Sequence, residues 1–134
     1  VDIVLPEGAA VLNAADPLVA RMAELCDGEV IFYGLAQDLP AIAAHRAQGG
    51  RALYLRENRV MLASGNVEGP FMELPVFVMN KDALDPERAA CLLAAVGAAV
   101  ALDIPVDKIR VGIDTFEREH KRPPRNRPRR VANQ

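Results

Sequence analysis

Residues 8–33 read GAAVLNAADPLVARMAELCDGEVIFY, and this stretch decides the fold. The apolar runs at 9–12 and 29–33 are each short enough to be a buried strand. Between them, Asp16 can accept hydrogen bonds from the free N–H groups of a helix that begins at Pro17, where a missing donor costs nothing. Strand, helix and strand in this order predict a parallel pair with a right-handed crossover. We therefore expect an α/β fold.

A second helix follows the quoted stretch. It begins at Pro40 and ends at Gly49-Gly50, since glycine favours the end of a helix and the turn after it. His45-Arg46 lies on the polar face of this helix, which predicts a solvated pair, because no acid or nucleophile is visibly partnered with it. The positions predicted to face the core are Leu18, Met22 and Leu25 in the first helix and Ile42 and Ala43 in the second.

Three further segments read as extended. Residues 51–56 and 59–63 suggest two strands joined by a tight turn. Residues 71–79 are apolar, and Pro75 within them cannot donate to a strand neighbour, which predicts a position at the edge of the sheet. The sequence therefore predicts one small sheet that is at least partly parallel.

Two helices complete the predicted domain. Asp85-Pro86 repeats the cap-plus-proline start, and residues 87–102 are rich in Ala and Leu and apolar nearly all round. Such a helix is expected to be buried between layers or against another domain. A shorter helix opens at Ile104-Pro105, and its apolar stripe is Val106, Ile109, Ile113 and Phe116.

Charge divides the chain into a domain at 1–117 and a tail at 118–134. The tail holds seven of the 16 Lys and Arg residues and one of the 18 acids, and its prolines block helix, so we expect it to be disordered. Its basic residues could bind a polyanion such as nucleic acid without sequence preference, since no aromatic residues are interleaved for stacking. A solvated tail, or sequence left by truncation of an ancestral gene, is the simpler alternative and the one we favour.

Bulk composition limits the other possibilities. The chain is 51% hydrophobic but only 4% aromatic, so its core should be aliphatic. No apolar run approaches the roughly 20 residues that span a bilayer, and residues 1–6 do not read as a signal peptide, so we expect a cytoplasmic protein that does not contact membranes. Cys26 and Cys91 fall in apolar helical patterns and are expected to be buried thiols; a metal site is not expected.

Several runs of residues resemble the Mur ligase family, which makes amide bonds at the expense of ATP. Residues 8–19 are similar to the Asn-Ala-x-Asp-Pro segment that follows a strand of the central ATPase domain. Residues 2–6 and 42–52 resemble the cyanophycin synthetase branch, in which a carboxylate is activated as an acyl phosphate and then attacked by an amine. Residues 101–116 resemble the helices that close the central domain. The resemblance thus implies the last part of that domain.

This resemblance implies a nucleotide site at Asn13 and Asp16, with ATP and Mg²⁺ as the cofactors of the family. In Mur ligases the motif asparagine lies against adenine, and its amide offers a donor and an acceptor to the edge of the base. Asn13 is equally an ordinary turn residue after a strand, and Asp16 is first of all a helix cap.

The sequence also departs from the family pattern. It contains no Gly-Lys pair and hence no P-loop, which in the family precedes the residues matched here. The C-terminal domain that helps to bind the amino-acid substrate is not seen after Phe116, and Cys91 stands where the family has an asparagine. We expect a ligase fragment that is inactive alone and has a P-loop-bearing ligase segment, or a second copy of itself, as partner. The alternative is a non-catalytic nucleotide-, protein- or polyanion-binding module that retains the fold.

Overall fold

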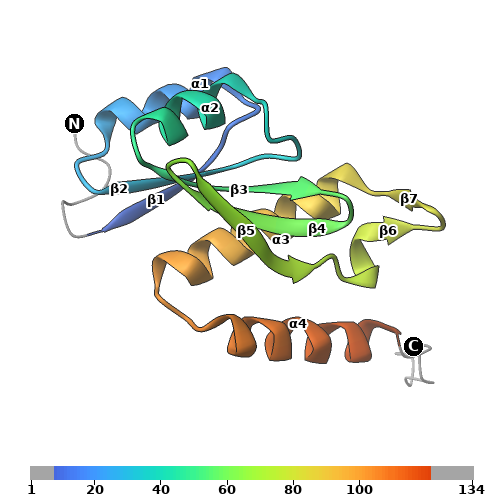
Figure 1. Ribbon diagram of the computed structural model, residues 1–134. Helices are drawn as coiled ribbons and strands as arrows, with labels where there is room; N and C mark the ends of the chain where they lie inside the picture. Colours follow the sequence, from blue (N-terminus) through green and yellow to red (C-terminus); the bar gives the residue numbers. More distant parts are fainter. Residues whose placement is uncertain (1–7, 122–134) are drawn as a thin grey trace, which may run out of the picture.

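A five-stranded mixed sheet organises the protein, in the order β1-β2-β3-β4-β5 (Figure 1). The computed structural model describes residues 8–121. Strands β1 (Ala9–Asn13), β2 (Glu29–Tyr33) and β3 (Arg51–Arg56) are parallel, and β4 (Arg59–Ser64) and β5 (Val67–Glu73) continue the sheet antiparallel. The predicted α/β class and the crossover between the first two strands are confirmed.

Both predicted aspartate caps are present at the starts of their helices. Helix α1 (Pro17–Arg21) starts at Asp16, whose Oδ1 accepts hydrogen bonds from the amides of Leu18 and Val19 at 3.0 and 3.4 Å. Helix α3 (Pro86–Ala101) starts at Asp85, which accepts from the amides of Glu87 and Arg88 at 3.1 and 3.2 Å. Each carboxylate thereby satisfies amides that have no partner within the helix.

One face of the sheet is covered by α1, by the 3₁₀ turn η1 (Met22–Leu25) and by α2 (Pro40–Ala47). The predicted inward stripe of the first helix is wrong, because Leu18, Met22 and Leu25 are 73%, 37% and 45% exposed. Ala20 and Ala23 pack on the sheet instead, since small side chains let the short helix approach closely and leave the larger ones outside. In α2, Ile42 is buried as predicted, whereas Ala43 is exposed.

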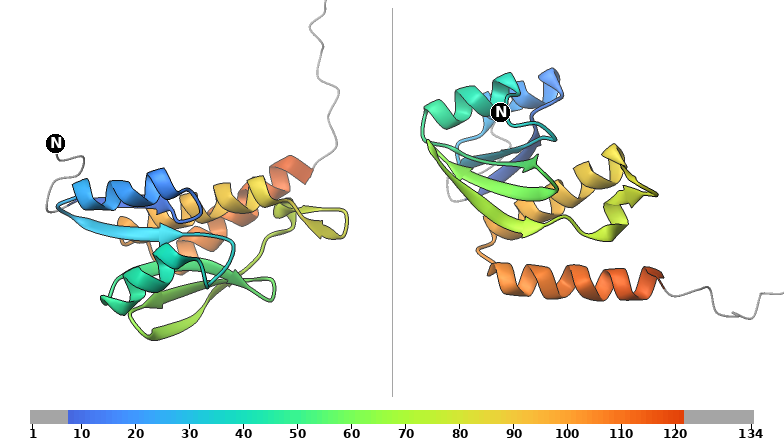
Figure 2. Two further views of the ribbon diagram at one scale, coloured as in Figure 1. Left: turned by 90° about the horizontal axis from the view of Figure 1, so that it is seen from above. Right: turned by 45° about the vertical axis from the view of Figure 1, so that its right-hand side comes forward.

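The opposite face of the sheet is covered by α3, which in turn is flanked by α4 (Val106–Lys121) (Figure 2). The Ala-rich helix buries one face against the sheet, with Leu93 and Val96 among its buried side chains. Cys91, Ala95 and Ala98 on its other side are exposed, so the prediction that the helix is buried between layers is wrong for that side. A Cβ placed on Gly97 would lie 2.6 Å from Cγ1 of Val11 in β1, so the lack of a side chain there allows the helix to cross the sheet closely.

The hairpin between β3 and β4 turns at Glu57 and Asn58, both of which have positive φ (52° and 66°), as a type I′ turn requires. The edge strand after it differs from the prediction for 71–79. β5 already begins at Val67 and ends at Glu73, and Pro70 lies within it opposite Met61, next to a register shift.

The segment after β5 is not extended throughout. Pro75 precedes a 3₁₀ turn, η2 (Val76–Val78), so it does not mark the sheet edge. A two-stranded ribbon, β6 (Met79–Asn80) with β7 (Ala83–Leu84), then leads into α3.

Helix α4 carries the predicted stripe, with Ile109 buried and the ring of Phe116 packed edge-on against Phe77 at 5.1 Å. Its length equals that of α3, so the prediction of a shorter helix is wrong. The helix also continues to Lys121, which makes 118–121 helical rather than part of a tail. The remaining tail residues, 122–134, lie outside the described part of the chain. No helix within that described part is long and apolar enough to cross a bilayer.

Candidate functional site

The carboxyl ends of the parallel strands form the first candidate site. In the register of β1 and β2, Asn13 is paired with Tyr33, so the last residues of both strands lie side by side. Open α/β sheets bind their ligands outside this edge, because the loops that follow the strands diverge there. Of the predicted site residues, the structure therefore places Asn13 at an edge where ligands commonly bind.

Asn13 is half-buried, and its side chain has one local task. Its Oδ1 accepts a hydrogen bond from the amide of Ala15 at 2.9 Å, and its carbonyl oxygen accepts one from the amide of Asp16 at 3.3 Å. Within residues 8–119, its Nδ2 has no hydrogen-bond partner. The turn function that we considered for Asn13 is thus present, and one donor is left for an acceptor from outside.

Asp16 has a different position. Its side chain is exposed and its Oδ1 serves the amides of Leu18 and Val19, as a helix cap does. This geometry gives Asp16 the task of fixing the turn that begins at Asn13. Its predicted contact with a nucleotide stays a prediction.

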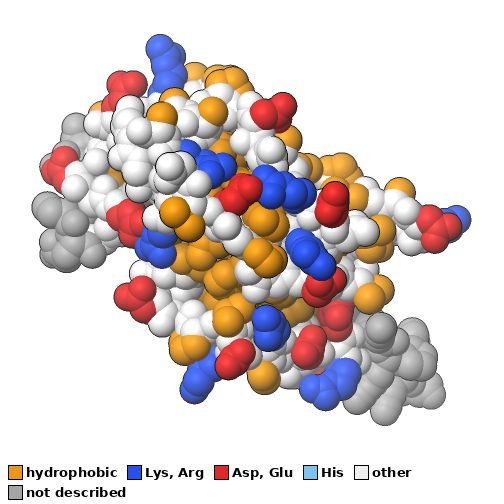
Figure 3. All heavy atoms as spheres, in the orientation of Figure 1, with side chains coloured by type: hydrophobic (Ala, Val, Ile, Leu, Met, Phe, Trp, Pro, Cys, Tyr) orange, Lys and Arg blue, Asp and Glu red, His pale blue; other side chains and the backbone are white. Residues whose placement is uncertain are grey.

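A charged network that the sequence analysis missed lies on the face covered by α2. In Figure 3 basic and acidic side chains lie side by side in this region, between α2 and β5. Glu68 accepts a hydrogen bond from the hydroxyl of Tyr54, and its carboxylate lies 2.8 Å from Nη1 of Arg56 and 3.6 Å from Nη1 of Arg46. Arg56 also donates from Nε to Gln37 at 2.8 Å.

Electrostatics in this network favour the charged form of the acid. The hydrogen bonds from Arg56 and Tyr54 lower the pKa of Glu68 to about 2. Burial and the bond to Glu68 raise the pKa of Tyr54. The guanidinium groups of Arg46 and Arg56 lie 5.7 and 5.9 Å from the centroid of its ring. The groups satisfy one another, so the network links α2 to strands β3 and β5 of the sheet.

Only a weak signal of this network is present in the sequence. Tyr54 and Arg56 are two positions apart in a strand and hence share a face, but Arg46 and Glu68 lie on other elements. The predicted solvated pair is wrong for both members. His45 bonds through Nε2 to the carbonyl of Val30 at 2.7 Å, and Arg46 donates from Nε to the carbonyl of Gly65 at 2.7 Å.

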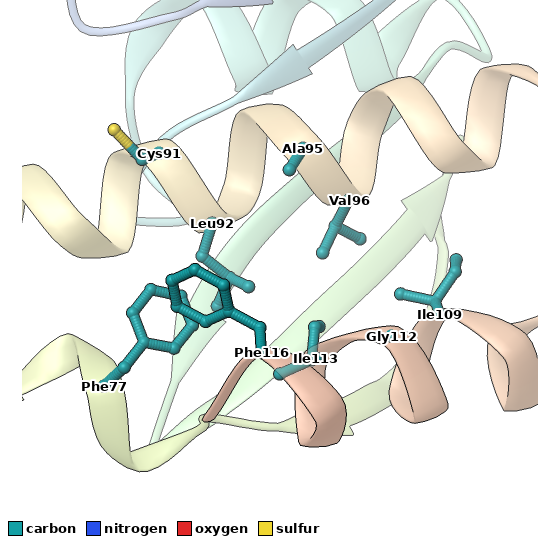
Figure 4. Close-up of a pocket in the computed structure, with 9 residues that line it drawn as sticks. All are labelled: Phe77, Cys91, Leu92, Ala95, Val96, Ile109, Gly112, Ile113 and Phe116. Atoms are coloured by element: carbon teal, nitrogen blue, oxygen red, sulfur yellow. The ribbon is translucent and has the colours of Figure 1, made fainter. Parts of the chain in front are cut away.

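An apolar groove between α3 and α4 is the second candidate site, with a volume of about 320 Å³ (Figure 4). Phe77 and Phe116 lie together at one end of the groove, and Ile109 and Ile113 of α4 line it opposite α3. Its lining has no charged side chain, so the groove can bury an apolar group but offers no acid or base. Cys91 borders it, and Figure 4 shows its thiol pointing away from the two phenylalanines. This cysteine is exposed, which corrects the prediction of a buried thiol; Cys26 is half-buried.

Comparison of the sequence with known proteins shows what this chain is similar to. The chain is 34% identical over 86% of its length to cyanophycin synthetase of Synechocystis sp. and 32% identical over 87% to that of Crocosphaera subtropica. It is 31% identical over 82% to the enzyme of Geminocystis herdmanii. The chain is related to cyanophycin synthetase. No family model matches it.

The relation to cyanophycin synthetase confirms the resemblance given by the residue runs, for which Mur ligase is the coarser label. The chain spans only 13% of the length of these three relatives. The comparisons therefore support a ligase-related segment, and they leave the roles of Asn13 and Asp16 as predictions.

Proposed function

We propose that this chain forms the adenine-side wall of a nucleotide site in an ATP-dependent ligase of the cyanophycin synthetase type. The observation that carries the proposal is the position of Asn13 at the carboxyl end of parallel strand β1, with Oδ1 engaged by Ala15 and Nδ2 free for a base nitrogen. An amide held by its oxygen presents its N–H₂ group in a fixed direction, which favours recognition of an acceptor on the base edge.

The residues of the chain fit the base of a nucleotide better than its phosphates. Phosphoryl transfer needs backbone amides and a lysine around the phosphates, together with metal ligands. The sequence contains no Gly-Lys pair, and within residues 8–119 no three His, Cys, Asp or Glu side chains gather as a metal site. The described residues therefore do not fit the Mg²⁺ of the family. We propose that a P-loop-bearing ligase segment acts as the partner of this chain, and that this chain is inactive alone.

Nucleotide binding is tested by adding ADP, and separately uncharged adenosine, to the ¹⁵N-labelled chain while its amide NMR signals are recorded. We expect saturable shifts at Asn13 and in the turn that follows it. Asn13→Asp keeps the oxygen that holds Ala15 but removes the N–H₂ donor, so it should weaken adenosine binding without unfolding the chain. Asn66→Ala, at an exposed asparagine between β4 and β5, is the matched control.

Two results would refute this proposal. The first is the absence of saturable shifts at millimolar nucleotide. The second is adenosine binding by Asn13→Asp as tight as that of the unaltered chain. The partner is tested separately, by mixing the chain with a P-loop-bearing segment of a cyanophycin synthetase that lacks the matching residues. Restored ATP hydrolysis supports the split-enzyme form, and no restoration overturns it.

A further inference from the structure

Tyr33 lies beside Asn13 on the same face of the sheet. Val11 in β1 lies directly under Gly97 of α3, and side chains alternate along a strand, so Asn13 also faces the α3 layer. In β2, Ile31 and Tyr33 pack in the core cluster formed with α3, whereas Phe32 belongs to the opposite cluster. The register pairs Asn13 with Tyr33, and neighbouring strands are about 5 Å apart. The two side chains are therefore adjacent on one face at the carboxyl edge.

The environment of Tyr33 differs from that of an ordinary core tyrosine. Its side chain is only half-buried, although it lies on a strand whose preceding three residues are buried. Within residues 8–119 its hydroxyl makes no hydrogen bond to another group, so it is open to water or to a ligand. Partial burial raises the pKa of Tyr33, and the electrostatic influence of the Cys91 thiol in α3 adds to the rise.

From this arrangement we propose that Tyr33 supplies the aromatic surface on which the base stacks while Asn13 contacts its edge. The inference rests on the proposed nucleotide site and names a further residue of it. Stacking and edge recognition are complementary: an aromatic ring tolerates any base, whereas the amide of Asn13 discriminates among base edges. With these two residues, the site needs no charged side chain to bind the base.

The test combines binding and thiol protection. Adenosine and ADP are titrated into the unaltered chain, Tyr33→Phe and Tyr33→Leu, each at a temperature where unfolding measurements show it folded. Tyr33→Phe keeps the ring and should bind nearly as well. Tyr33→Leu removes it and should weaken adenosine binding roughly 5-fold or more, the loss typical of a base–aromatic stack.

Cys91 serves as an independent reporter because it is exposed and lies near Tyr33. ADP should slow alkylation of Cys91 by iodoacetamide, followed by mass spectrometry, in the unaltered chain and in Tyr33→Phe. The half-buried Cys26, which bonds to carbonyls of Gly28 and Glu29, is the internal reference and should react at an unchanged rate.

The outcomes separate this inference from the function on which it rests. If nucleotide shifts the Asn13 signal but Tyr33→Leu binds equally well, Tyr33 is not a base-stacking residue and the nucleotide site stands. If Tyr33→Phe binds as poorly as Tyr33→Leu, the ring does not carry the effect and the inference is also overturned. If no nucleotide shifts Asn13, both proposals fall together.

Discussion

The crossing of α3 over β1 depends on Gly97, and adding one methyl group there should destabilise the protein measurably. In Gly97→Ala the new Cβ would lie 2.6 Å from Cγ1 of Val11 and 3.5 Å from Cδ1 of Leu53. Carbon atoms pack best at about 3.5–4.0 Å, so the helix and the strand must separate by roughly 1 Å. Overpacking of this kind typically costs about 1–3 kcal/mol.

Helix propensity acts in the opposite direction and has to be separated from this cost. Replacing Gly by Ala inside a helix stabilises it by about 0.8–1.0 kcal/mol. Gly112→Ala in α4 provides the control, since no atom lies within 4 Å of the Cβ built there. The propensity gain is common to both variants, so the difference between their free energies of unfolding isolates the contact and should be about 1–3 kcal/mol, with Gly97→Ala the less stable.

Urea unfolding followed by far-UV circular dichroism measures this difference, a suitable probe because the chain has no Trp. The slope with urea should be the same in both variants if only the folded state is affected. Combining Gly97→Ala with Val11→Ala should recover part of the loss, because the methyl group that obstructs the helix is removed. Equal or greater stability of Gly97→Ala relative to Gly112→Ala would refute the close-approach argument.

Three further predictions concern single features of the structure. The pKa of Glu68 is lowered to about 2 in the folded protein from its usual 4.5, so its charged contacts stabilise the fold above pH 4.5 and this contribution is lost as the pH falls toward 2. Glu68→Gln should therefore show a smaller loss of unfolding free energy over that pH range. An identical pH profile of the variant and the unaltered chain would contradict the assignment. Asp85→Ala removes a helix cap and should lower the free energy of unfolding in urea by about 1 kcal/mol. Asp82→Ala, at an exposed aspartate in the turn between β6 and β7, should lower it by less than about 0.5 kcal/mol. Equal costs would count against the cap. Removing residues 122–134 leaves α4 intact and deletes five arginines. If the tail binds polyanions, the unaltered chain should bind a heparin column in a salt-sensitive way, and the shortened chain should be retained far less. Unchanged retention would exclude that role.

The candidate site shows how far sequence reasoning extends. Asn13 and Asp16 were assigned to the site because residues 8–19 resemble the Asn-Ala-x-Asp-Pro segment of Mur ligases; their positions after a strand and before a helix predict only a turn residue and a helix cap. Tyr33 and Cys91 could not be assigned to the same corner, since strand register and the path of α3 bring them there from distant parts of the chain. The network at Glu68 was missed for the same reason, as its two arginines lie on separate elements.

The sequence by itself determined the strands at 9–12 and 29–33, the parallel crossover, and the helix starts at Asp16 and Asp85, through local hydrogen bonding and backbone preference. These features depend on residues that are neighbours along the chain, so the pattern contains the necessary information. Only the tertiary structure decided which face of α1 turns inward. Periodicity marks an apolar stripe at Leu18, Met22 and Leu25, but the close approach of the helix to the sheet admits only the alanines on its other side.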